Sequence, residues 1–575
     1  MATTLISPGV LALENDQSFI SQQPVTVGAA IIGPTVKGQV EIPTIVTSYS
    51  EYQNKFGTTF TSASQVYTYF TSIAAYNYFN NGGDTLLVAR VVSGTFTSAT
   101  TDSSSVANCF IASTGSSATQ SFALQTLSEG IIMNSSSSLD SSGALASGTT
   151  NNVRWQIVNS SATQGTFDLL IRRGDDTTNN PTVLETWTGL SLDPYAPNYV
   201  SRVLGDYTLN YNATTNQVEI SGSYPNRSAY VRVQSVDLPT PNYFDNNGSP
   251  KAAFTSSLPA AGSGSFGAAV GTIMSGGQYY DTITDGNKSQ GIPSGSYTNM
   301  INLLSNADDY RFNVLLTPGL FDSLQTSQCT SIINNTQNRG DNIFVLDLVP
   351  YGTQTPSAVV TQAQSRNTSY AASYWPWCQV IDPDSGKNVW VPASTLIGGV
   401  YAYNDKVAEP WFAPAGINRG GLGIVTRAAL KLSQSNRDTL YSGKVNPIAT
   451  FPGTGVVVYG QKTLQTKASA LDRVNVRRLL ISLKSYISQV AQNLVFEQNT
   501  IATRNQFLSQ VNPYLQSVQQ RQGLYAFKVV MDDSNNTPDV IDRNQLVGQI
   551  YIQPTKTAEF IYLDFNILPT GVTFP

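Results

Sequence analysis

The residues that could carry out chemistry in this chain are few, and histidine is not among them. The sequence of 575 residues contains no histidine. Ser-His-Asp and Cys-His catalysis, histidine-ligated zinc and general acid–base catalysis by imidazole are therefore excluded. This absence restricts the possible functions more strongly than any motif in the sequence.

Two pairs of carboxylates could resemble the acid and base of a glycosidase, namely Asp308 with Asp309 and Asp382 with Asp384. The second pair lies in Asp-Pro-Asp-Ser-Gly between the apolar residues Val380 and Val389, a composition typical of a tight turn. The first pair directly precedes an apolar strand and is interpreted as surface or capping residues. Neither pair predicts a catalytic site.

Two further motifs could bind ligands. Asp532, Asp533, Asn535 and Asn536 offer oxygen ligands for calcium, but their spacing differs from an EF-hand loop and favours a turn. The glycines at 420, 421 and 423 do not fit G-x-G-x-x-G, and no Walker A lysine is present, so they predict close backbone packing. We therefore predict no catalytic residue, no cofactor and no metal site.

Composition predicts a multidomain protein with real hydrophobic cores. A chain of this length exceeds what one core supports, so three or four domains are expected. Hydrophobic residues make up 41% of the chain, which argues against disorder, while charged residues make up only 12%. A surface with few charges protects a free molecule poorly against self-association. This composition is expected of a polymer subunit and also of a polar β protein.

Charge is unevenly distributed along the chain. The net charge of −5 argues against a protein that coats nucleic acid. From residue 401 onward the chain holds 17 Lys and Arg against 11 Asp and Glu, whereas the first 400 residues hold 15 against 26. The excess is greatest over residues 462–504. This stretch is interpreted either as a solvated helix face or as a surface that meets an acidic partner.

The three cysteines, Cys109, Cys329 and Cys378, are far apart and odd in number. They are typical of buried small apolar residues in a protein folded in a reducing compartment. No signal-peptide pattern and no apolar run near 18 residues is found, so a soluble protein made in a cytoplasm is expected.

The last hundred residues show the clearest secondary-structure pattern. Apolar residues at three- and four-residue spacing predict a helix over 476–494 and a second one from about Thr500. Pro513 is expected to break or restart the second helix, and Gly523 to end it. Strands are predicted at 524–531, 546–553 and 558–567.

The order and spacing of motifs in this segment resemble the C-terminal domain of contractile-tail sheath proteins, found in phages, R-type pyocins and related injection machines. The matching stretches are Asn475–Arg478, Phe496–Asn499, Thr503-Arg504, Asn536–Pro538, Ile541–Asn544, Tyr551–Pro554 and Phe560-Ile561 to Phe565. The opening residues (Ser7–Val10, Glu14–Asp16, Gly33-Pro34, Phe56-Gly57) and the middle (185–200, 411–420) are also similar to this family.

The predicted fold combines α/β and all-β domains. An N-terminal arm covers 1–20, the N-terminal part of the sheath core 21–95, an inserted β-sandwich 96–240, an α/β domain 241–440, the C-terminal sheath domain 441–567 and a C-terminal arm 568–575. Alternating strands and helices favour a parallel sheet in the fourth of these. The resemblance implies a subtilisin-like, non-catalytic fold for it, and an α+β core completed by both ends of the chain.

The resemblance implies a structural, non-enzymatic subunit that polymerises as stacked hexameric rings around a tail tube and contracts to drive the tube through the host envelope. Expected partners are further copies of the chain, the tube protein, and baseplate and tail terminator proteins, with no nucleic acid and no membrane insertion. The expected location is the virion tail, after assembly in the host cytoplasm.

Two groups of residues are predicted to make these contacts. The terminal arms are expected to add to a neighbour's open sheet edge through Val10, Leu11, Leu13, Ile567 and Leu568. Because the C-terminal domain faces the tube in sheath proteins, Arg473, Arg477, Arg478 and Lys484 are candidate tube contacts. Arg477 and Arg478 are more simply interpreted as ordinary exposed helix arginines.

Two other classes of protein stay open at this point. A virion or secreted glycan-binding adhesin, or a glycoside hydrolase, would share the polar β-rich composition. A different self-assembling shell, such as an S-layer or capsid protein, would share the weak charging.

Overall fold

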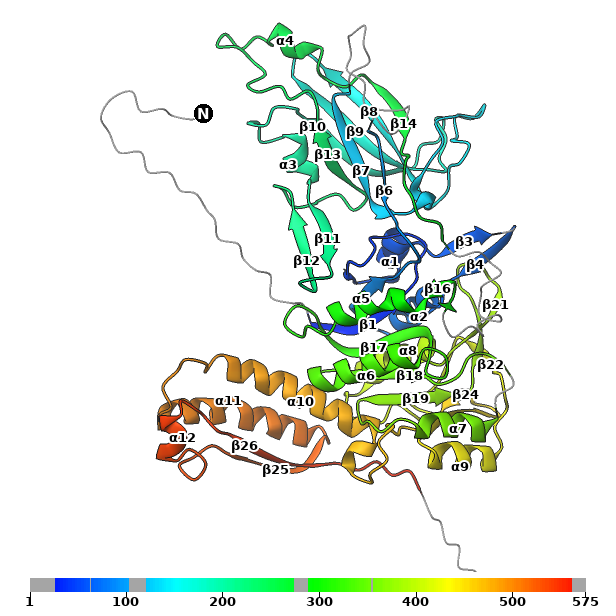
Figure 1. The fold of residues 1–575 in the computed structure, drawn as a ribbon, viewed down its shortest axis with the longest axis vertical. Coiled ribbons are helices and arrows are strands. Elements are labelled where there is room, and N and C mark those ends of the chain that lie inside the picture. The colour runs from blue at the N-terminus through cyan, green and yellow to red at the C-terminus, as the bar shows by residue number, and fades with distance from the viewer. Residues whose placement is uncertain (1–25, 63, 103–119, 274–287, 353–354, 561–575) are drawn as a thin grey trace, which may run out of the picture.

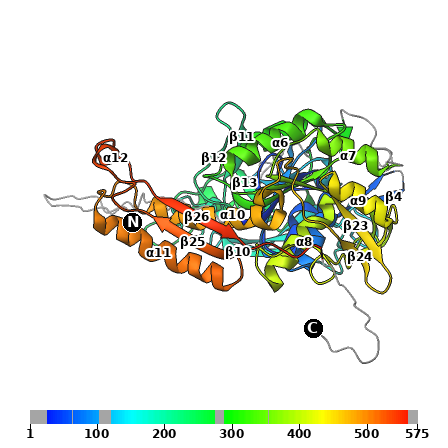
Figure 2. The same ribbon diagram turned by 90° about the horizontal axis from the view of Figure 1, so that it is seen from below.

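The computed structural model describes residues 26–62, 64–102, 120–273, 288–352 and 355–560. An α/β domain lies at the centre, a β domain lies above it, and a helical pair with a β-hairpin projects from its lower left (Figure 1). Seen from below, this projection extends well beyond the side of the α/β domain (Figure 2).

An eight-stranded sheet forms the centre of the α/β domain. Its strand order is β2-β5-β1-β17-β18-β19-β23-β24, in which neighbouring strands from β5 to β23 are parallel and the two outer strands are antiparallel to their neighbours. The bounds are β1 Thr26–Gly33, β2 Thr44–Val46, β5 Leu86–Arg90, β17 Arg311–Phe321, β18 Ile343–Asp347, β19 Ala371–Trp375, β23 Val445–Phe451 and β24 Gly455–Val458. The alternation of strands and helices predicted this parallel sheet.

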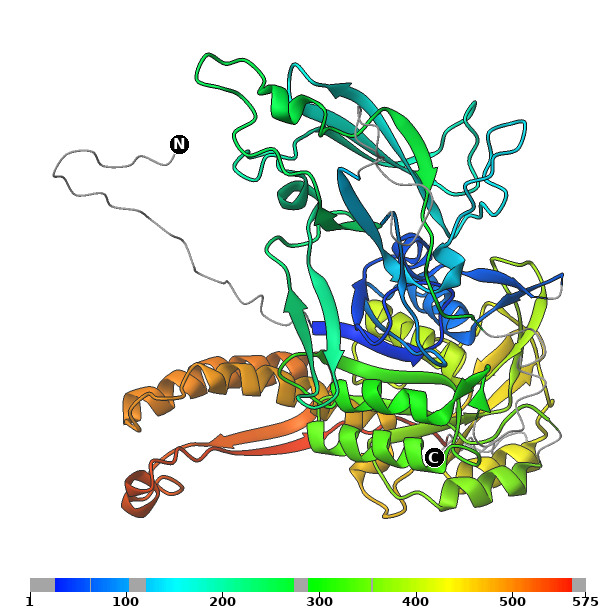
Figure 3. The same ribbon diagram turned by 45° about the horizontal axis from the view of Figure 1, so that its top comes forward.

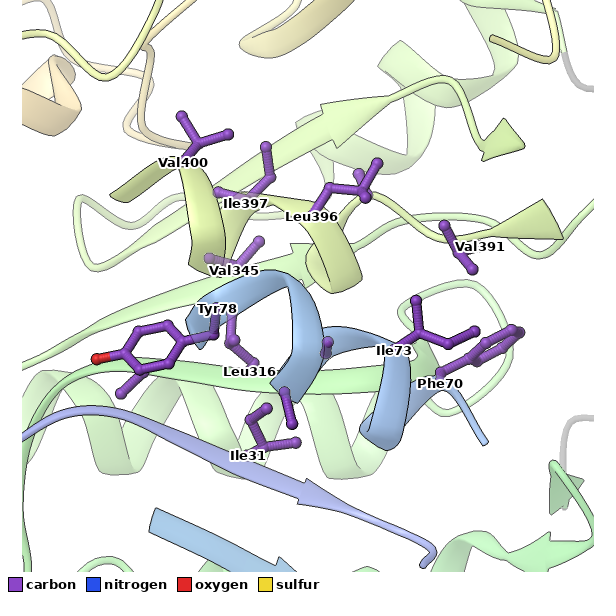
Figure 4. Packing of buried hydrophobic residues seen from close by; sticks show 14 of the residues in the cluster. Ile31, Phe70, Ile73, Tyr78, Leu316, Val345, Val391, Leu396, Ile397 and Val400 are labelled. Carbon is purple, nitrogen blue, oxygen red and sulfur yellow. The ribbon is translucent and has the colours of Figure 1, made fainter. Parts of the chain in front are cut away.

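Helices cover both faces of the sheet, so its strands are buried on both sides. Alternate strand residues separate accordingly: Ile31 packs in one hydrophobic cluster and Ile32 in the other. The first cluster includes α2 (Phe70–Asn80) and α8 (Ser394–Val407), which pack together on the sheet (Figure 4). The second includes α5 (Thr298–Leu303), α6 (Thr326–Arg339), α7 (Pro356–Gln364) and α9 (Gln434–Ser442).

The N-terminal segment belongs to this central sheet, which corrects the predicted division. Residues 21–95 were expected to complete the C-terminal domain, but β1 pairs with β17 in parallel, with Ala29 opposite Val314. The apolar runs of β1 and β5 need cover on both faces, and only the large sheet with its two helix layers supplies it.

The apolar residues between 65 and 79 are divided between a strand and a helix. Residues Thr59–Ser62 (β3) and Gln65–Thr68 (β4) form a hairpin, and α2 starts only at Phe70. The β-branched and aromatic residues Val66 and Tyr67 favour the extended pairing. Before this hairpin, α1 (Tyr49–Phe56) begins at Ser48, whose side chain accepts a hydrogen bond from the Glu51 backbone N–H.

The inserted domain consists of two antiparallel sheets around one hydrophobic cluster. One sheet has the order β10-β9-β8-β14 (Val183–Leu190, Thr166–Arg173, Val153–Ser161, Gly262–Ser265) and the other β13-β7-β6 (Val231–Val236, Phe122–Glu129, Ser98–Thr100). A hairpin, β11 (Thr208–Asn212) and β12 (Gln217–Ser221), reaches down toward the α/β domain (Figure 3). The short helices α3 (Val200–Leu204) and α4 (Ala252–Thr255) complete this part of the chain.

The insertion extends past the predicted boundary at residue 240, because β14 pairs with β8 and Phe266 lies in the shared cluster. Its entering and leaving chains run side by side: the Thr97 N–H donates to the Val270 carbonyl over 3.0 Å, and the Thr100 N–H to the Gly267 carbonyl over 2.8 Å. Arg90, at the end of β5, is fully buried beneath it and donates to the carbonyl oxygens of Gly38 and Glu129.

Smaller elements flank the central sheet. Strands β20 (Cys378–Ile381), β21 (Asn388–Val391) and β22 (Val425–Ala428) form a three-stranded sheet in the order β21-β20-β22. Strands β15 (Lys288–Ser289) and β16 (Ile292–Pro293) pair with each other. Cys329 and Cys378 are buried free thiols, whereas Cys109 lies outside the described residues.

The C-terminal domain contains helices α10 (Val474–Gln492) and α11 (Ile501–Gln520), strand β25 (Leu524–Val530), helix α12 (Pro538–Asp542) and strand β26 (Gln549–Pro554). The predicted break at Pro513 is wrong, since α11 continues through it. Pro513 and Ser509, whose carbonyl loses its partner, both face solvent, where water can replace the missing bond. Leu515 and Val511 meanwhile anchor the helix in the core.

The helix end also differs from expectation in one respect. The left-handed residue is Gln522, with φ of 64°, and not Gly523. The Gly523 N–H donates to the Val518 carbonyl, and a Cβ at Gly523 would lie 2.6 Å from the Val518 side chain. Glycine is thus required here for close packing. Of the strand predicted at 558–567, residues 558–560 are not extended in a ladder and the rest lies outside the described residues.

Candidate functional site

The carboxyl ends of parallel strands are where α/β proteins usually hold their active sites. Here β18 ends in Asp347, and the backbone N–H of Ser394 donates to its carboxylate over 3.0 Å, as does the Ser394 hydroxyl. Both side chains are buried, and burial raises the pKa of Asp347 to about 7 despite those two hydrogen bonds. Because the serine is inaccessible and the chain lacks histidine, this pair cannot act as a nucleophile and its base.

The candidate carboxylate pairs have structural roles. Asp382 is buried and accepts from Thr68 and Ser385, while Asp384 accepts from Tyr49 and Gln53 of α1. The turn predicted between Val380 and Val389 is confirmed by the pairing of β20 with β21. Asp308 and Asp309 are exposed after α5, where Asn306 donates to Asp309.

The other candidate ligand motifs also hold the fold together. Asp532 accepts from the Ser534 backbone N–H over 2.9 Å, as the turn interpretation predicts. A Cβ at Gly420 would lie 2.7 Å from the Val458 carbonyl oxygen, which confirms the close backbone packing. Within the described ranges, no three metal-ligating side chains lie together.

Arg477 and Arg478, two of the candidate tube contacts, lie inside the molecule, each with 4% of its surface exposed. Arg477 donates to Ser369 and stacks 3.9 Å from the centre of the Tyr370 ring. Arg478 pairs with Asp405 and lies 4.7 Å from the centre of the Tyr401 ring. This side of α10 therefore attaches the C-terminal domain to the α/β domain. Arg477 and Arg478 do not form an exposed basic surface.

Arg473 and Lys484 differ from each other. Arg473 lies at the N-terminal end of α10 and donates to both oxygens of Glu559, over 2.7 and 2.9 Å. Tyr441 and Gln461 donate to the same carboxylate, and these hydrogen bonds and the arginine's charge hold its pKa below the usual value. Lys484 is exposed.

The predicted arm contacts Val10, Leu11, Leu13, Ile567 and Leu568 lie outside the described residues. What the structure does describe is a possible acceptor. Strands β25 and β26 pair only with each other, so each has an outer edge without a neighbouring strand among the described residues. The hydrogen bonds to Glu559 hold the chain in place just before residues 561–575, which lie outside the described residues.

The far end of the C-terminal domain joins two loops into one rigid tip. Asn499, in the α10–α11 loop, donates to the Gln545 carbonyl over 2.8 Å and accepts from Arg504. Buried Asn536 receives the Val547 N–H and donates back to the Val547 carbonyl. The sequence motifs include Phe496, Asn499 and Asn536, but nothing in them indicates that Phe496 is fully exposed.

Comparison with known proteins identifies the family. Residues 295–464 match the phage tail sheath protein central domain and residues 466–568 the phage tail sheath C-terminal domain. These two stretches of the chain are therefore similar to phage tail sheath proteins, and the resemblance stated from the sequence is confirmed. The adhesin or hydrolase alternative finds no support.

Individual relatives agree. The chain is 43% identical over 208 residues to the tail sheath protein of Vibrio phage KVP40, which is 36% of this chain and 31% of the relative. It is 41% identical over 187 residues to that of Enterobacteria phage T4, which is 32% of this chain and 28% of the relative. The matches thus span about a third of the relatives' length.

One solved structure extends the likeness to nearly the whole chain. The crystal structure of a sheath tail protein from Listeria innocua aligns with a TM-score of 0.51 and 10% sequence identity, over 92% of this chain and 96% of that one. At this identity the likeness establishes a mixed α/β fold shared with a sheath protein. Within the described part of the chain, none of the helices has both the length and the apolar character needed to cross a bilayer.

The positions of the α10 cations predict different mutational effects. Arg478→Ala should destabilise the protein by about 2–4 kcal/mol, mainly because it leaves a void beside Tyr401 where the buried guanidinium packs; its bond to the partly exposed Asp405 adds little. Lys484→Ala, on the same helix but exposed, should change stability by less than about 0.5 kcal/mol. Guanidinium unfolding curves measure both. Equal, small effects would show that Arg478 faces solvent.

Asp347 predicts a pH dependence of stability. Its folded pKa of about 7 lies above the unfolded value near 3.9, so the folded state takes up a proton between these values and stability falls as pH rises through this window. Asp347→Asn should therefore exceed the native chain in stability by a few kcal/mol at pH 8, and by almost nothing near pH 4. Asp308→Asn, at an exposed site, is the control. A stability gain from Asp347→Asn that does not depend on pH would refute the buried-carboxyl explanation; the measurement is thermal unfolding across pH 4–8.

Proposed function

We propose that the chain is a structural subunit of a contractile tail sheath. It polymerises as stacked hexameric rings around a tail tube and contracts to drive the tube through the host envelope. The observation that carries this proposal is the match of two adjoining sheath domains over residues 295–568, supported by relatives that are tail sheath proteins. Because these matches cover a third of the relatives, the activity and partners are inferred.

The proposed partners are other copies of the chain, the tube protein, and the baseplate and tail terminator proteins. The proposed location is the virion tail, after assembly in the host cytoplasm. The central domain would be a subtilisin-like, non-catalytic α/β unit, which is consistent with the buried Asp347–Ser394 pair and the absence of histidine.

Arm exchange is the proposed linkage between copies. The outer edges of β25 and β26 suit an added strand, because a two-stranded hairpin leaves backbone N–H and C=O groups unpaired along both sides. Each added hydrogen bond contributes about 0.5–1.5 kcal/mol, while ordering each arm residue costs about 1–2 kcal/mol. One arm alone is marginal, so apolar anchors such as Val10 and Leu11 and repetition over many copies must supply the difference.

Contraction would draw on the free-energy difference between two packings of the assembled copies. No nucleotide is required by this proposal. Linkage through arms would keep neighbours connected while the domains exchange contacts.

Electron microscopy of the purified chain in negative stain, at rising concentration and with or without a tube, tests the function. Hollow striated tubes are the expected result, since contacts between unlike surfaces that do not close propagate as a helix. Flat sheets or closed shells would favour a different self-assembling layer. Monomers under all conditions, tube included, would overturn the sheath proposal.

Deletion of Met1–Leu13 tests the arms. The shortened chain should unfold at the same temperature as the full chain, because β1 begins only at Thr26. It should fail to form tubes, because it lacks the strand that a neighbour's hairpin would receive. Full-length tubes from this variant would rule out the N-terminal arm as a required link.

A further inference from the structure

The α10–α11 loop and the first residue of α11 present three exposed apolar side chains at the far end of the C-terminal domain. Phe496 is fully exposed, Val495 is 60% exposed and Ile501 is 65% exposed. None of them is part of the hydrophobic cluster that holds α10 and α11 together, whereas the neighbouring Leu494 is. Smaller polar residues at these three positions would therefore leave the hydrophobic packing of the folded monomer unchanged.

Phe496 is also in an unfavourable backbone conformation. Its φ is 73°, a region that bulky L-residues rarely occupy because the side chain crowds the following carbonyl. The surrounding loop is held in place by Asn499 and Arg504, so the strain is imposed by a rigid support. A strained, exposed aromatic residue on a rigid support is the arrangement expected of a binding anchor.

The charges around this anchor are mainly acidic. Over 493–504 and 531–548 the chain carries five carboxylates and two arginines. Arg504 is buried and pairs with Asp533, and the exposed Arg543 pairs with Asp539, so the two arginines offset two of the five carboxylates. Glu497 is exposed beside Phe496. The tip, defined as residues 493–504 and 531–548, therefore suits an apolar surface bordered by Lys or Arg.

The chain carries a surface of that kind elsewhere. On the outer face of the β21-β20-β22 sheet, Ile381 is 54% exposed and Arg427 lies 5.2 Å from the centre of the half-buried Trp390 ring. Lys387 and Lys431, both exposed, flank these strands. The carboxylates of the β20–β21 turn, Asp382 and Asp384, are engaged by Thr68, Tyr49 and Gln53. We call this basic, apolar surface the β20–β22 face.

We propose that the tip of one copy docks on the β20–β22 face of a second copy, with Phe496 as the central anchor. The tip and the face lie at opposite ends of the molecule, at the left and right of Figure 1. A contact between unlike surfaces is heterologous, so it joins copies head to tail into a closed ring or an open helix, depending on the rotation between them. This contact rests on the proposed function only in that the copies must associate.

The terminal segments are poorer occupants of the tip. Residues 1–25 carry Glu14 and Asp16, residues 561–575 carry Asp564, and neither segment contains Lys or Arg. Both would be repelled by the acidic tip. The tip is therefore a second, separate contact, in addition to the edges of β25 and β26 proposed for the arms.

Two variants of the full chain test the contact. Phe496→Asp alters the tip, and Ile381→Asp with Arg427→Glu alters the face. Each should raise the protein concentration needed for assembly at least tenfold, measured by sedimentation velocity. A 1:1 mixture should form complexes at concentrations where neither variant does alone, because each copy supplies the surface that the other lacks.

Matched variants separate binding from folding. Ile220→Asp changes an apolar residue of β12 whose exposure, 61%, is close to the 54% of Ile381, and it should leave assembly unchanged. Phe496→Asn should preserve or raise the melting temperature, since asparagine tolerates positive φ, while still impairing assembly.

The outcomes distinguish this inference from the function on which it rests. If the native chain forms tubes and both variants assemble equally well, the tip contact alone is overturned. The same holds if the mixture of the two variants assembles no better than each variant by itself. Variants that assemble normally but lose only the tube would assign the tip to the tube and also overturn it. A native chain that never assembles would overturn the sheath function and the contact together.

Discussion

The pairing of β1 with β17 is the contact on which the remaining structure depends. It brings together strands that are separated in sequence by the whole inserted domain, and it places β5 and β2 at one side of the central sheet. Without it, neither hydrophobic face of the sheet would be complete, because Ile31 and Ile32 of β1 belong to the clusters on opposite faces and α2 packs against α8 on one of them (Figure 4). Such distant pairing is entropically costly to form and is supported by burial on both faces.

The C-terminal domain depends in turn on that sheet, through arginines. Arg477 and Arg478 extend from α10 across aromatic rings of the α/β domain, and Arg521 pairs with Glu409 and stacks on Trp411. Guanidinium groups suit this position because they are planar, remain charged and stack on rings. The base of the helical pair is thus firmly attached, whereas its far end carries the exposed Phe496. The helical pair is therefore attached to the α/β domain at one end and presents an apolar side chain at the other.

Local patterns predicted the parts of the fold that depend on neighbouring residues. The spacing of Leu479, Leu483 and Val490 predicted α10, and the turn residues after Met531 predicted the hairpin connection. Partners distant in sequence were not predictable. Arg478 and Asp405 are 73 positions apart, and nothing local shows that the arginine is buried. Pro513 was judged by its missing N–H, although its solvent-facing position decides the outcome. The arm and tube contacts concern assembled copies, and they stay predictions.

The adjacent entrance and exit of the inserted domain have a consequence for evolution. Since Thr97 and Thr100 lie beside Val270 and Gly267, the chain enters and leaves the domain through one two-stranded stem, and the domain also contacts the α/β domain through Glu129 and the β11–β12 hairpin. A domain with neighbouring ends can be lost, enlarged or replaced while the central sheet keeps its strand order, provided that buried Arg90 finds another acceptor in place of the Glu129 carbonyl. This stem is the place where related chains could exchange the inserted domain, and where a foreign domain could be grafted.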